Sequence, residues 1–178
     1  MSNENQEKSI LKRIAPILTV GVIVLIIILL FLSISTSQNM TVVYTGNVDR
    51  KPVNIILGKF QDSDCGMVID DITYASQVVS KDGKTWFFHD HGGMVNWIKN
   101  KPFKDTAVIW VMAKDTKKYI DGRSAWYSRT DSTPMFYGFG AYKNKADGLI
   151  DYDTMFLHMV RGEHLGNPKI KKMLLEDK

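Results

Sequence analysis

The stretch YASQVVSKDGKTWFFHDHGGMVNWIK, residues 74–99, contains the clearest structural signal in this chain. Residues 74–80 and 85–90 are runs of residues that favour β-strands, and Lys81-Asp82-Gly83-Lys84 separates them. An Asp-Gly pair between two such runs is typical of a tight hairpin turn, because glycine accepts the backbone conformation that the turn needs. The stretch therefore predicts a two-stranded antiparallel hairpin.

A helix and a buried strand follow this hairpin. Gly92-Gly93 ends the second strand, and residues 94–99 have the pattern of a short helix that Pro102 closes. Residues 107–113, AVIWVMA, are a continuous apolar run of strand length, which is typical of a fully buried strand. The first half of the domain thus predicts the order strand, strand, helix, strand.

The second half repeats this order in part. Residues 124–129 and 137–143 favour strands, and a helix over 154–161 starts at Asp151 or Asp153. We therefore expect an α+β fold that contains two related ββαβ-type units, as a weak internal duplication.

Two more segments lie outside these units. Residues 42–44 and 53–57 predict a strand pair joined through Gly46-Asn47, and 168–176 predicts a short basic helix. The expected division of the chain is a cytoplasmic tail at 1–13, a transmembrane helix at 14–34, a linker with the N-terminal strands at 35–59, a main domain at 60–145 and a helical extension at 146–178.

Residues 14–34 predict a helix that spans a membrane. These 21 residues carry no charge, and at about 1.5 Å per residue they cover a hydrocarbon core of roughly 30 Å. A cleaved signal peptide is the alternative, although its apolar region is usually only about 7–15 residues long. No cysteine follows at the distance that a lipoprotein anchor needs. The basic residues Lys8, Lys12 and Arg13 favour a cytoplasmic N-terminus, a single pass through the inner membrane and a periplasmic domain.

The charge and cysteine content exclude some classes of protein. The chain has 23 Lys and Arg residues, of which three precede the helix and 20 lie in the domain. It has 19 Asp and Glu residues, of which two precede the helix and 17 lie in the domain. A net charge of +3 is too small and too dispersed to indicate nucleic-acid binding. A single cysteine excludes an internal disulfide, so the apolar core must stabilise the fold.

That cysteine, Cys65, is the first candidate metal ligand. It lies in the irregular, glycine-containing segment 61–67, two residues before Met67. Thiolate and thioether sulfurs are soft ligands that select Cu(I) over harder ions. A buried and inert thiol is the alternative, but the polar flanking residues are not typical of a core.

Two histidines and a distant methionine are further candidates. In an extended segment His89 and His91 point to one face, with Asp90 on the other, and two imidazoles there could bind copper or zinc. Surface histidines at a strand end are the alternative. Met135 follows Pro134 in a polar loop, which is unusual for a core methionine.

Three other residues with sulfur or imidazole side chains are expected in the core. Met155, His158 and Met159 have the spacing of one helical stripe, which favours a packed face.

Catalysis has little support, since no nucleophile motif and no glycine-rich phosphate loop is present. A thiolate–imidazole pair of Cys65 with His89 or His91 is the best enzymatic alternative. We expect a binding protein, not an enzyme.

The order of several motifs resembles the NosL family of copper-binding accessory proteins for nitrous oxide reductase maturation. The similar segments lie between about residues 60 and 145: Asp64-Cys65-Gly66-Met67-Val68-Ile69, Tyr74 to Val79, Trp86 to Met94, Tyr119 to Tyr127, Thr133-Pro134-Met135 and Gly138 to Tyr142. Unlike typical members, which are lipoproteins, this chain has an apolar helix as its predicted anchor, and it has His89-Asp90-His91-Gly92 where many members have an Asp-Asp-Ile-Gly-like segment.

The resemblance implies a fold and a function. The fold is a NosL/MerB-like domain of two ββαβ units, and the metal is one Cu(I) that is passed to apo nitrous oxide reductase or its membrane-bound maturation complex. The implied ligands are Cys65, Met67 and Met135, and His89 and His91 are possible additions. General periplasmic copper handling and a metal-independent interaction domain are the alternatives.

Overall fold

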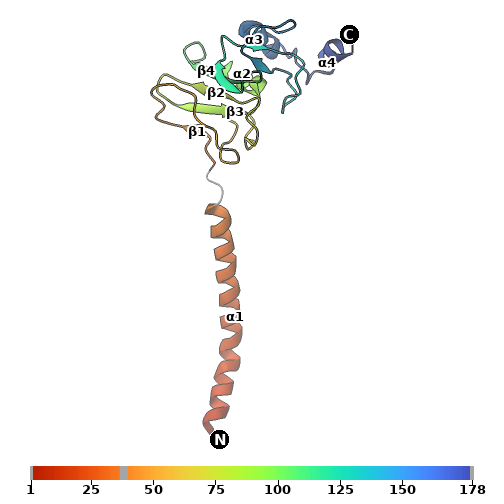
Figure 1. Ribbon diagram of the computed structural model, residues 1–178. Coiled ribbons are helices and arrows are strands. Elements are labelled where there is room, and N and C mark those ends of the chain that lie inside the picture. Colours follow the sequence, from red (N-terminus) through yellow and green to blue (C-terminus); the bar gives the residue numbers. More distant parts are fainter. Residues whose placement is uncertain (1, 37–39, 177–178) are drawn as a thin grey trace. The chain divides into compact units, whose positions relative to one another are not determined.

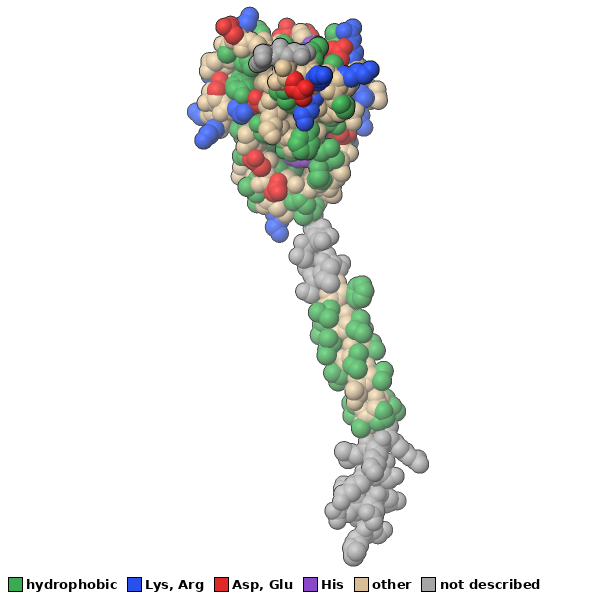
Figure 2. All heavy atoms as spheres, turned by 90° about the vertical axis from the view of Figure 1, so that its right-hand side faces the viewer, with side chains coloured by type: hydrophobic (Ala, Val, Ile, Leu, Met, Phe, Trp, Pro, Cys, Tyr) green, Lys and Arg blue, Asp and Glu red, His purple; other side chains and the backbone are tan. Residues whose placement is uncertain are grey.

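The computed structural model describes residues 2–36 and 40–176, which form two separate units. The first unit is one helix, α1 (Ser2–Thr36), longer than the expected 14–34 because residues of the predicted tail continue it. Its segment Ala15–Leu32 has a mean hydropathy of 3.1, and none of it is buried. Figure 2 shows hydrophobic side chains on the exposed surface of this segment. By length and composition α1 can cross a membrane as an anchor or serve as a signal sequence.

The second unit is an α+β domain with a mixed sheet (Figure 1). The strand order is β1-β3-β2-β4-β7-β6, and β5 pairs with β4. All pairs are antiparallel except β4 with β7. The strands are β1 (Val43–Tyr44), β2 (Ser76–Val79), β3 (Thr85–Phe88), β4 (Val108–Ala113), β5 (Lys118–Asp121), β6 (Trp126–Tyr127) and β7 (Ala141–Tyr142).

The predicted hairpin is confirmed as β2 and β3. Their register pairs Ser76 with Phe88 and Val79 with Thr85. Gly83 in the turn has φ +76°, and a Cβ there would lie 3.0 Å from the Asn47 backbone. Glycine is therefore needed at this position both for its conformation and for its lack of a side chain.

The predicted strand pair near the N-terminus is wrong. β1 pairs with β3, and residues 53–57 form no strand. The amide of Val53 donates to the Gln77 side chain at 2.8 Å, and the Gln77 amide donates back to the Val53 carbonyl at 2.7 Å. Because one side chain satisfies this backbone, the segment needs no partner strand there.

The helix after the hairpin begins earlier than the sequence predicts. α2 spans His91–Ile98, and the Asp90 side chain caps it by accepting a hydrogen bond from the Gly92 amide at 2.9 Å. Gly92 is therefore not a turn between the strand and the helix, as the sequence suggests, but lies in the first turn of the helix. A Cβ on Gly92 would lie 2.5 Å from the Tyr137 ring, so its absence permits close packing.

The expected duplication is incomplete. The first ββαβ repeat, β2-β3-α2-β4, has the predicted order, but β5 lies in a segment where the sequence predicts no strand. In the second half β6 and β7 precede α3 (Tyr152–Val160), and the chain described up to Glu176 continues with α4 (Pro168–Leu175) instead of a closing strand. Both halves share one sheet, since Ala113 of β4 pairs with Ala141 of β7.

Two apolar clusters cover the two faces of the sheet. One joins sheet residues such as Val78 and Phe88 to α2 and α3, and Met155 and Met159 of α3 are buried in it as predicted. The smaller cluster contains Phe87 and Ala75 with Ile55, Phe60 and Ile69. Phe87 and Phe88 thus point to opposite faces, as successive strand residues must. α3 packs with α2, so this part of the predicted extension after residue 145 belongs to the core, whereas α4 has no buried residue.

Candidate metal centre

The loop that carries Cys65 is closed by its own backbone. Gly66 has φ +76°, its amide donates to the Asp62 carbonyl at 3.0 Å, and the Asp62 amide donates to the Met67 carbonyl at 2.8 Å. Glycine adopts this left-handed conformation at little cost, which lets the chain reverse directly after Cys65. The side chain of Cys65 is left exposed at the tip.

A buried carboxylate organises this loop. Asp62 is 2% exposed, and its Oδ1 accepts hydrogen bonds from the amides of Asp64 at 2.7 Å and Cys65 at 3.1 Å. Its Oδ2 accepts from the His89 amide at 2.8 Å and lies 2.5 Å from His89 Nδ1. Since a carboxylate only accepts, Nδ1 carries the proton of this last bond. Asp62 thereby fixes both the cysteine loop and the histidine.

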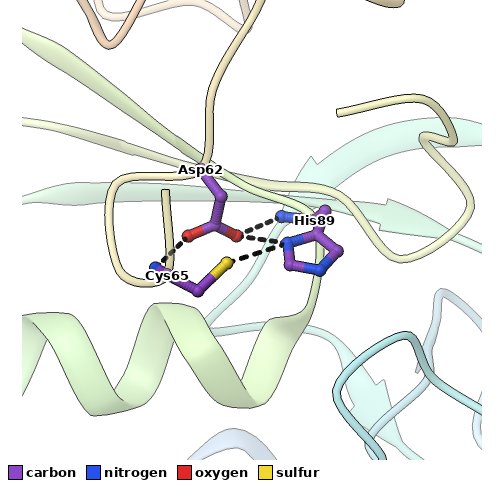
Figure 3. A group of neighbouring side chains, drawn as sticks. All are labelled: Asp62, Cys65 and His89. Atoms are coloured by element: carbon purple, nitrogen blue, oxygen red, sulfur yellow. Dashed lines mark hydrogen bonds and ion pairs between the residues drawn. The ribbon is translucent and has the colours of Figure 1, made fainter. Parts of the chain in front are cut away.

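Cys65 and His89 meet at this carboxylate (Figure 3). The Cys65 Sγ lies 3.8 Å from His89 Nδ1, and one ligand atom from each of Asp62, Cys65 and His89 lies within 4.8 Å of the others. His89 directly follows β3 and is 6% exposed. Among the described residues this is the one group of three or more His, Cys, Asp or Glu side chains arranged to hold a metal ion.

The protonation of the group is set by its surroundings. Although Cys65 is exposed as a residue, partial desolvation of its thiol raises the thiol pKa, and the charges of Asp62 and Asp64 add to this effect. The hydrogen bond to Asp62 raises the pKa of His89 against the opposing effect of burial. Burial also acts to raise the pKa of Asp62, but hydrogen bonds from His89, Asp64 and Cys65 outweigh it and lower that pKa. In the metal-free centre these shifts favour the protonated thiol of Cys65, the ionised carboxylate of Asp62 and the protonated imidazole of His89, each relative to the free side chain.

More carboxylates lie around the group. Asp64 accepts from the Asn96 side chain at 3.3 Å, and burial raises the pKa of Asp64. Burial likewise raises the pKa of Asp90, the cap of α2. The same carboxylates act on Tyr137. Burial raises the pKa of Tyr137, and the negative charges of Asp64 and Asp90 raise it further. A bound cation would offset this concentration of negative charge.

No protein-family model, curated protein or solved structure matches this chain. The resemblance to the NosL family rests on the motifs in the sequence alone.

The two methionine ligands stay predictions. Met67 is 45% exposed and two residues from Cys65. The amide of Met135 donates to Asp90 Oδ2 at 2.9 Å, which holds the Met135 loop against the residue after His89. The distances that define the cluster involve neither thioether.

His91 lies in a different environment from His89. It is fully buried at the start of α2, where its Nδ1 lies 2.7 Å from Ser76 Oγ. Burial lowers the pKa of His91 to about 3. The strand alternation that would align His89 with His91 ends at Phe88, because the chain turns into the helix at Asp90. His91 is therefore not part of the cluster.

Sequence reasoning missed the importance of Asp62. The flanking polar residues of Cys65 indicate a loop, but they do not reveal which of them is buried. The available signal was the spacing of a carboxylate three residues before a cysteine, which lets its side chain cap the amide of that cysteine.

Proposed function

We propose that this chain is a membrane-anchored, periplasmic Cu(I) chaperone that supplies copper for the assembly of the nitrous oxide reductase copper centres. The observation that carries the metal-binding part is the 3.8 Å approach of Cys65 Sγ to His89 Nδ1. The receiving enzyme comes from the family resemblance. Apo nitrous oxide reductase and its membrane-bound maturation complex are the proposed partners.

The separation of these atoms fits two ligands of one ion. Metal–sulfur and metal–nitrogen bonds of about 2.3 and 2.0–2.1 Å at an angle of roughly 120° place the ligand atoms about 3.8 Å apart. A thiolate and an imidazole favour copper or zinc, and added thioethers from Met67 and Met135 favour Cu(I). We propose Cys65 and His89 as the central ligands, with these two methionines completing the shell.

Asp62 is proposed as a positioning residue instead of a ligand. Each of its oxygens already accepts two hydrogen bonds. Three of these bonds come from the amides of Asp64, Cys65 and His89, so Asp62 positions the loop and the histidine through their backbone. Loading a metal at Nδ1 requires that the Cys65 proton and the Nδ1 proton of His89 leave, so binding releases protons and replaces the hydrogen bond between Nδ1 and Asp62 by a bond to the metal.

The proximity of cysteine, histidine and aspartate also favours a thiol enzyme as a second candidate. In a catalytic triad the histidine uses one ring nitrogen for the nucleophile and the other for the carboxylate. Here both Cys65 and Asp62 face the same nitrogen, Nδ1. The raised pKa of Cys65 further disfavours an activated thiolate. We therefore favour metal binding.

Competition for Cu(I) tests the proposal. The full chain in detergent is titrated against a coloured Cu(I) chelator, with Cys65→Ala and His89→Gln as variants. His158→Gln is the matched control, because His158 lies on α3 and pairs with Glu163 outside the cluster. Loss of affinity in both site variants, with no change in the control, supports the centre. Equal affinity in wild type and Cys65→Ala would contradict it and favour a metal-independent interaction domain.

The proposed topology has its own test. Cys65 is the single cysteine of the chain and is exposed, so a membrane-impermeant maleimide reports which side of the membrane it occupies. Labelling of spheroplasts without lysis is expected. Labelling only after lysis would contradict a periplasmic domain.

The partner is tested in cells. Deletion of the gene that encodes this chain is expected to lower the copper content of nitrous oxide reductase, while the total copper content of the periplasm stays unchanged. Loss of copper from several periplasmic enzymes would instead favour a general copper-handling protein.

A further inference from the structure

Exposed apolar side chains gather beside the metal centre. Three segments contribute them, and exposure runs from 39% for Val43 to 59% for Ile56. The residues of this apolar surface are Val42, Val43, Tyr44, Ile56, Leu57, Met67 and Val68.

Backbone contacts hold the three segments together. Thr41 pairs with Phe60, and Gln61 pairs with Val68, so residues near 41, 60 and 68 run side by side. Ser63 Oγ donates to the Val42 carbonyl at 3.2 Å, which attaches the cysteine loop to the same group. The three segments are thus neighbours along their backbones, and the third carries Met67, two residues from Cys65.

This surface includes an edge of the sheet. β1 ends the strand order and pairs, within the described chain, with β3 alone. Exposed apolar side chains gathered in this way mark surfaces that contact a protein or a membrane. We therefore expect the apolar surface to contact a binding partner.

The chain length indicates which partner is nearest. Only residues 37–39 separate α1 from Met40. Covalent geometry limits the distance between the Cα atoms of Thr36 and Met40 to about 14 Å. If α1 spans a membrane, Thr41 and Val42 are necessarily close to its surface. Tyr44 is a residue type enriched at membrane interfaces.

We propose that the apolar surface docks on the lipid surface of the membrane that α1 anchors. This inference rests on the anchor in the proposed function, but it does not depend on the metal. Shallow insertion of several apolar side chains into the headgroup region stabilises such contacts. Docking holds Cys65 and Met67 at the membrane surface, where a membrane-bound partner can exchange a metal with them.

Spin labels on the full chain test the proposal. In a Cys65→Ala background, single cysteines are introduced as Leu57→Cys, Leu157→Cys or Leu25→Cys, labelled, and reconstituted into phosphatidylcholine–phosphatidylglycerol vesicles. Leu57 lies in the apolar surface, and Leu157 on α3 is a matched control with 44% exposure against 53%. Leu25 lies in α1 and reports on the anchor itself. Relaxation by oxygen, which concentrates in lipid, is compared with relaxation by a water-soluble nickel complex.

Each outcome decides something. Docking predicts an oxygen-to-nickel ratio several-fold higher at position 57 than at position 157. A high ratio at position 25 with equal, low ratios at 57 and 157 would overturn the docking and leave the anchor intact. Protection of position 57 from both reagents would also overturn it, because a protein, such as a second copy, would then cover the surface. A low ratio at position 25 would overturn both, whereas Cu(I) titration of the wild-type chain would still test the metal centre.

Discussion

Cys65 Sγ lies 3.8 Å from His89 Nδ1, although the two residues are 24 positions apart in the chain. Asp62 holds the two residues close together, since one of its oxygens accepts a hydrogen bond from the Cys65 amide and the other accepts one from His89. The loop and the end of β3 are therefore held together by one buried carboxylate. Several consequences of this arrangement can be measured.

Removing the charge of Asp62 should weaken both fold and metal binding. In Asp62→Asn one end of the side chain becomes a donor, so two of the four amide and imidazole donors lose their acceptor. A loss of about 1–3 kcal/mol in the free energy of unfolding is expected, as for buried groups left without a partner. Cu(I) affinity should fall by roughly 10- to 100-fold, as when outer-shell partners of metal ligands are changed.

Urea unfolding and chelator competition measure these two effects. Asp147→Asn is the control, because Asp147 is exposed and lies in the segment between β7 and α3. An Asp62→Asn variant as stable as the control would show that the carboxylate does not organise the centre.

The pH dependence of stability follows from the same pair. The raised pKa of His89 contributes stability below its ordinary value of 6.5, which is lost as pH rises through the folded pKa. The lowered pKa of Asp62 contributes stability above its ordinary value of 3.8, which is lost as pH falls through the folded pKa. Their joint contribution to the metal-free protein is therefore fully present between these two ordinary values.

Urea titrations across this range test the pair. The stability difference between wild type and His89→Gln should be largest between the two ordinary pKa values and should shrink as pH rises through the raised folded pKa of His89. A difference that is constant with pH would indicate that the pair is not ionic.

The reactivity of Cys65 distinguishes a metal ligand from a nucleophile. Because burial and two aspartates raise the pKa of its thiol, alkylation by iodoacetamide should be slow at pH 7 and should accelerate only at alkaline pH. Asp62→Asn removes one of these charges and should increase the rate at pH 7. Fast alkylation of the wild type at pH 6 would instead support the thiol enzyme.

Gly92 and Gly93 allow a matched test of packing at the start of α2. In Gly92→Ala the new Cβ would lie 2.5 Å from the Tyr137 ring, and such overpacking costs about 1–3 kcal/mol. In Gly93→Ala the nearest atom is Asp64 Oδ2 at 3.6 Å, so the better helix propensity of alanine should be neutral or stabilising by up to about 1 kcal/mol. Thermal unfolding of both variants measures the difference. Equal melting temperatures would contradict the close contact with Tyr137.

The parts of the fold that local chemistry dictates were predictable. Asp82-Gly83 specifies the hairpin turn, the apolar run at 107–113 gives β4, and Pro168 after Asn167 starts α4. The partner of β1 was not predictable, because Gln77, a residue in another strand, replaces the expected pairing at Val53. The start of α2 was missed because Gly92 suggests a turn, whereas its role depends on Tyr137, a residue 45 positions later.

The candidate site was predictable in its chemistry but not in its geometry. Residue types indicated Cys65 and His89 as ligands, but adjacency to His89 also suggested His91, which the fold buries against Ser76. Asp62 was overlooked, since burial of a polar loop residue depends on tertiary packing. The thioethers of Met67 and Met135 stay predictions.

X-ray absorption of the copper-loaded full chain tests the central claim most directly. The Cys65–His89 centre predicts sulfur at about 2.3 Å and a nitrogen at about 2.0 Å from copper, with the nitrogen contribution lost in His89→Gln and copper itself lost in Cys65→Ala. Copper bound without any sulfur neighbour, or an identical spectrum in the wild type and His89→Gln, would contradict the account.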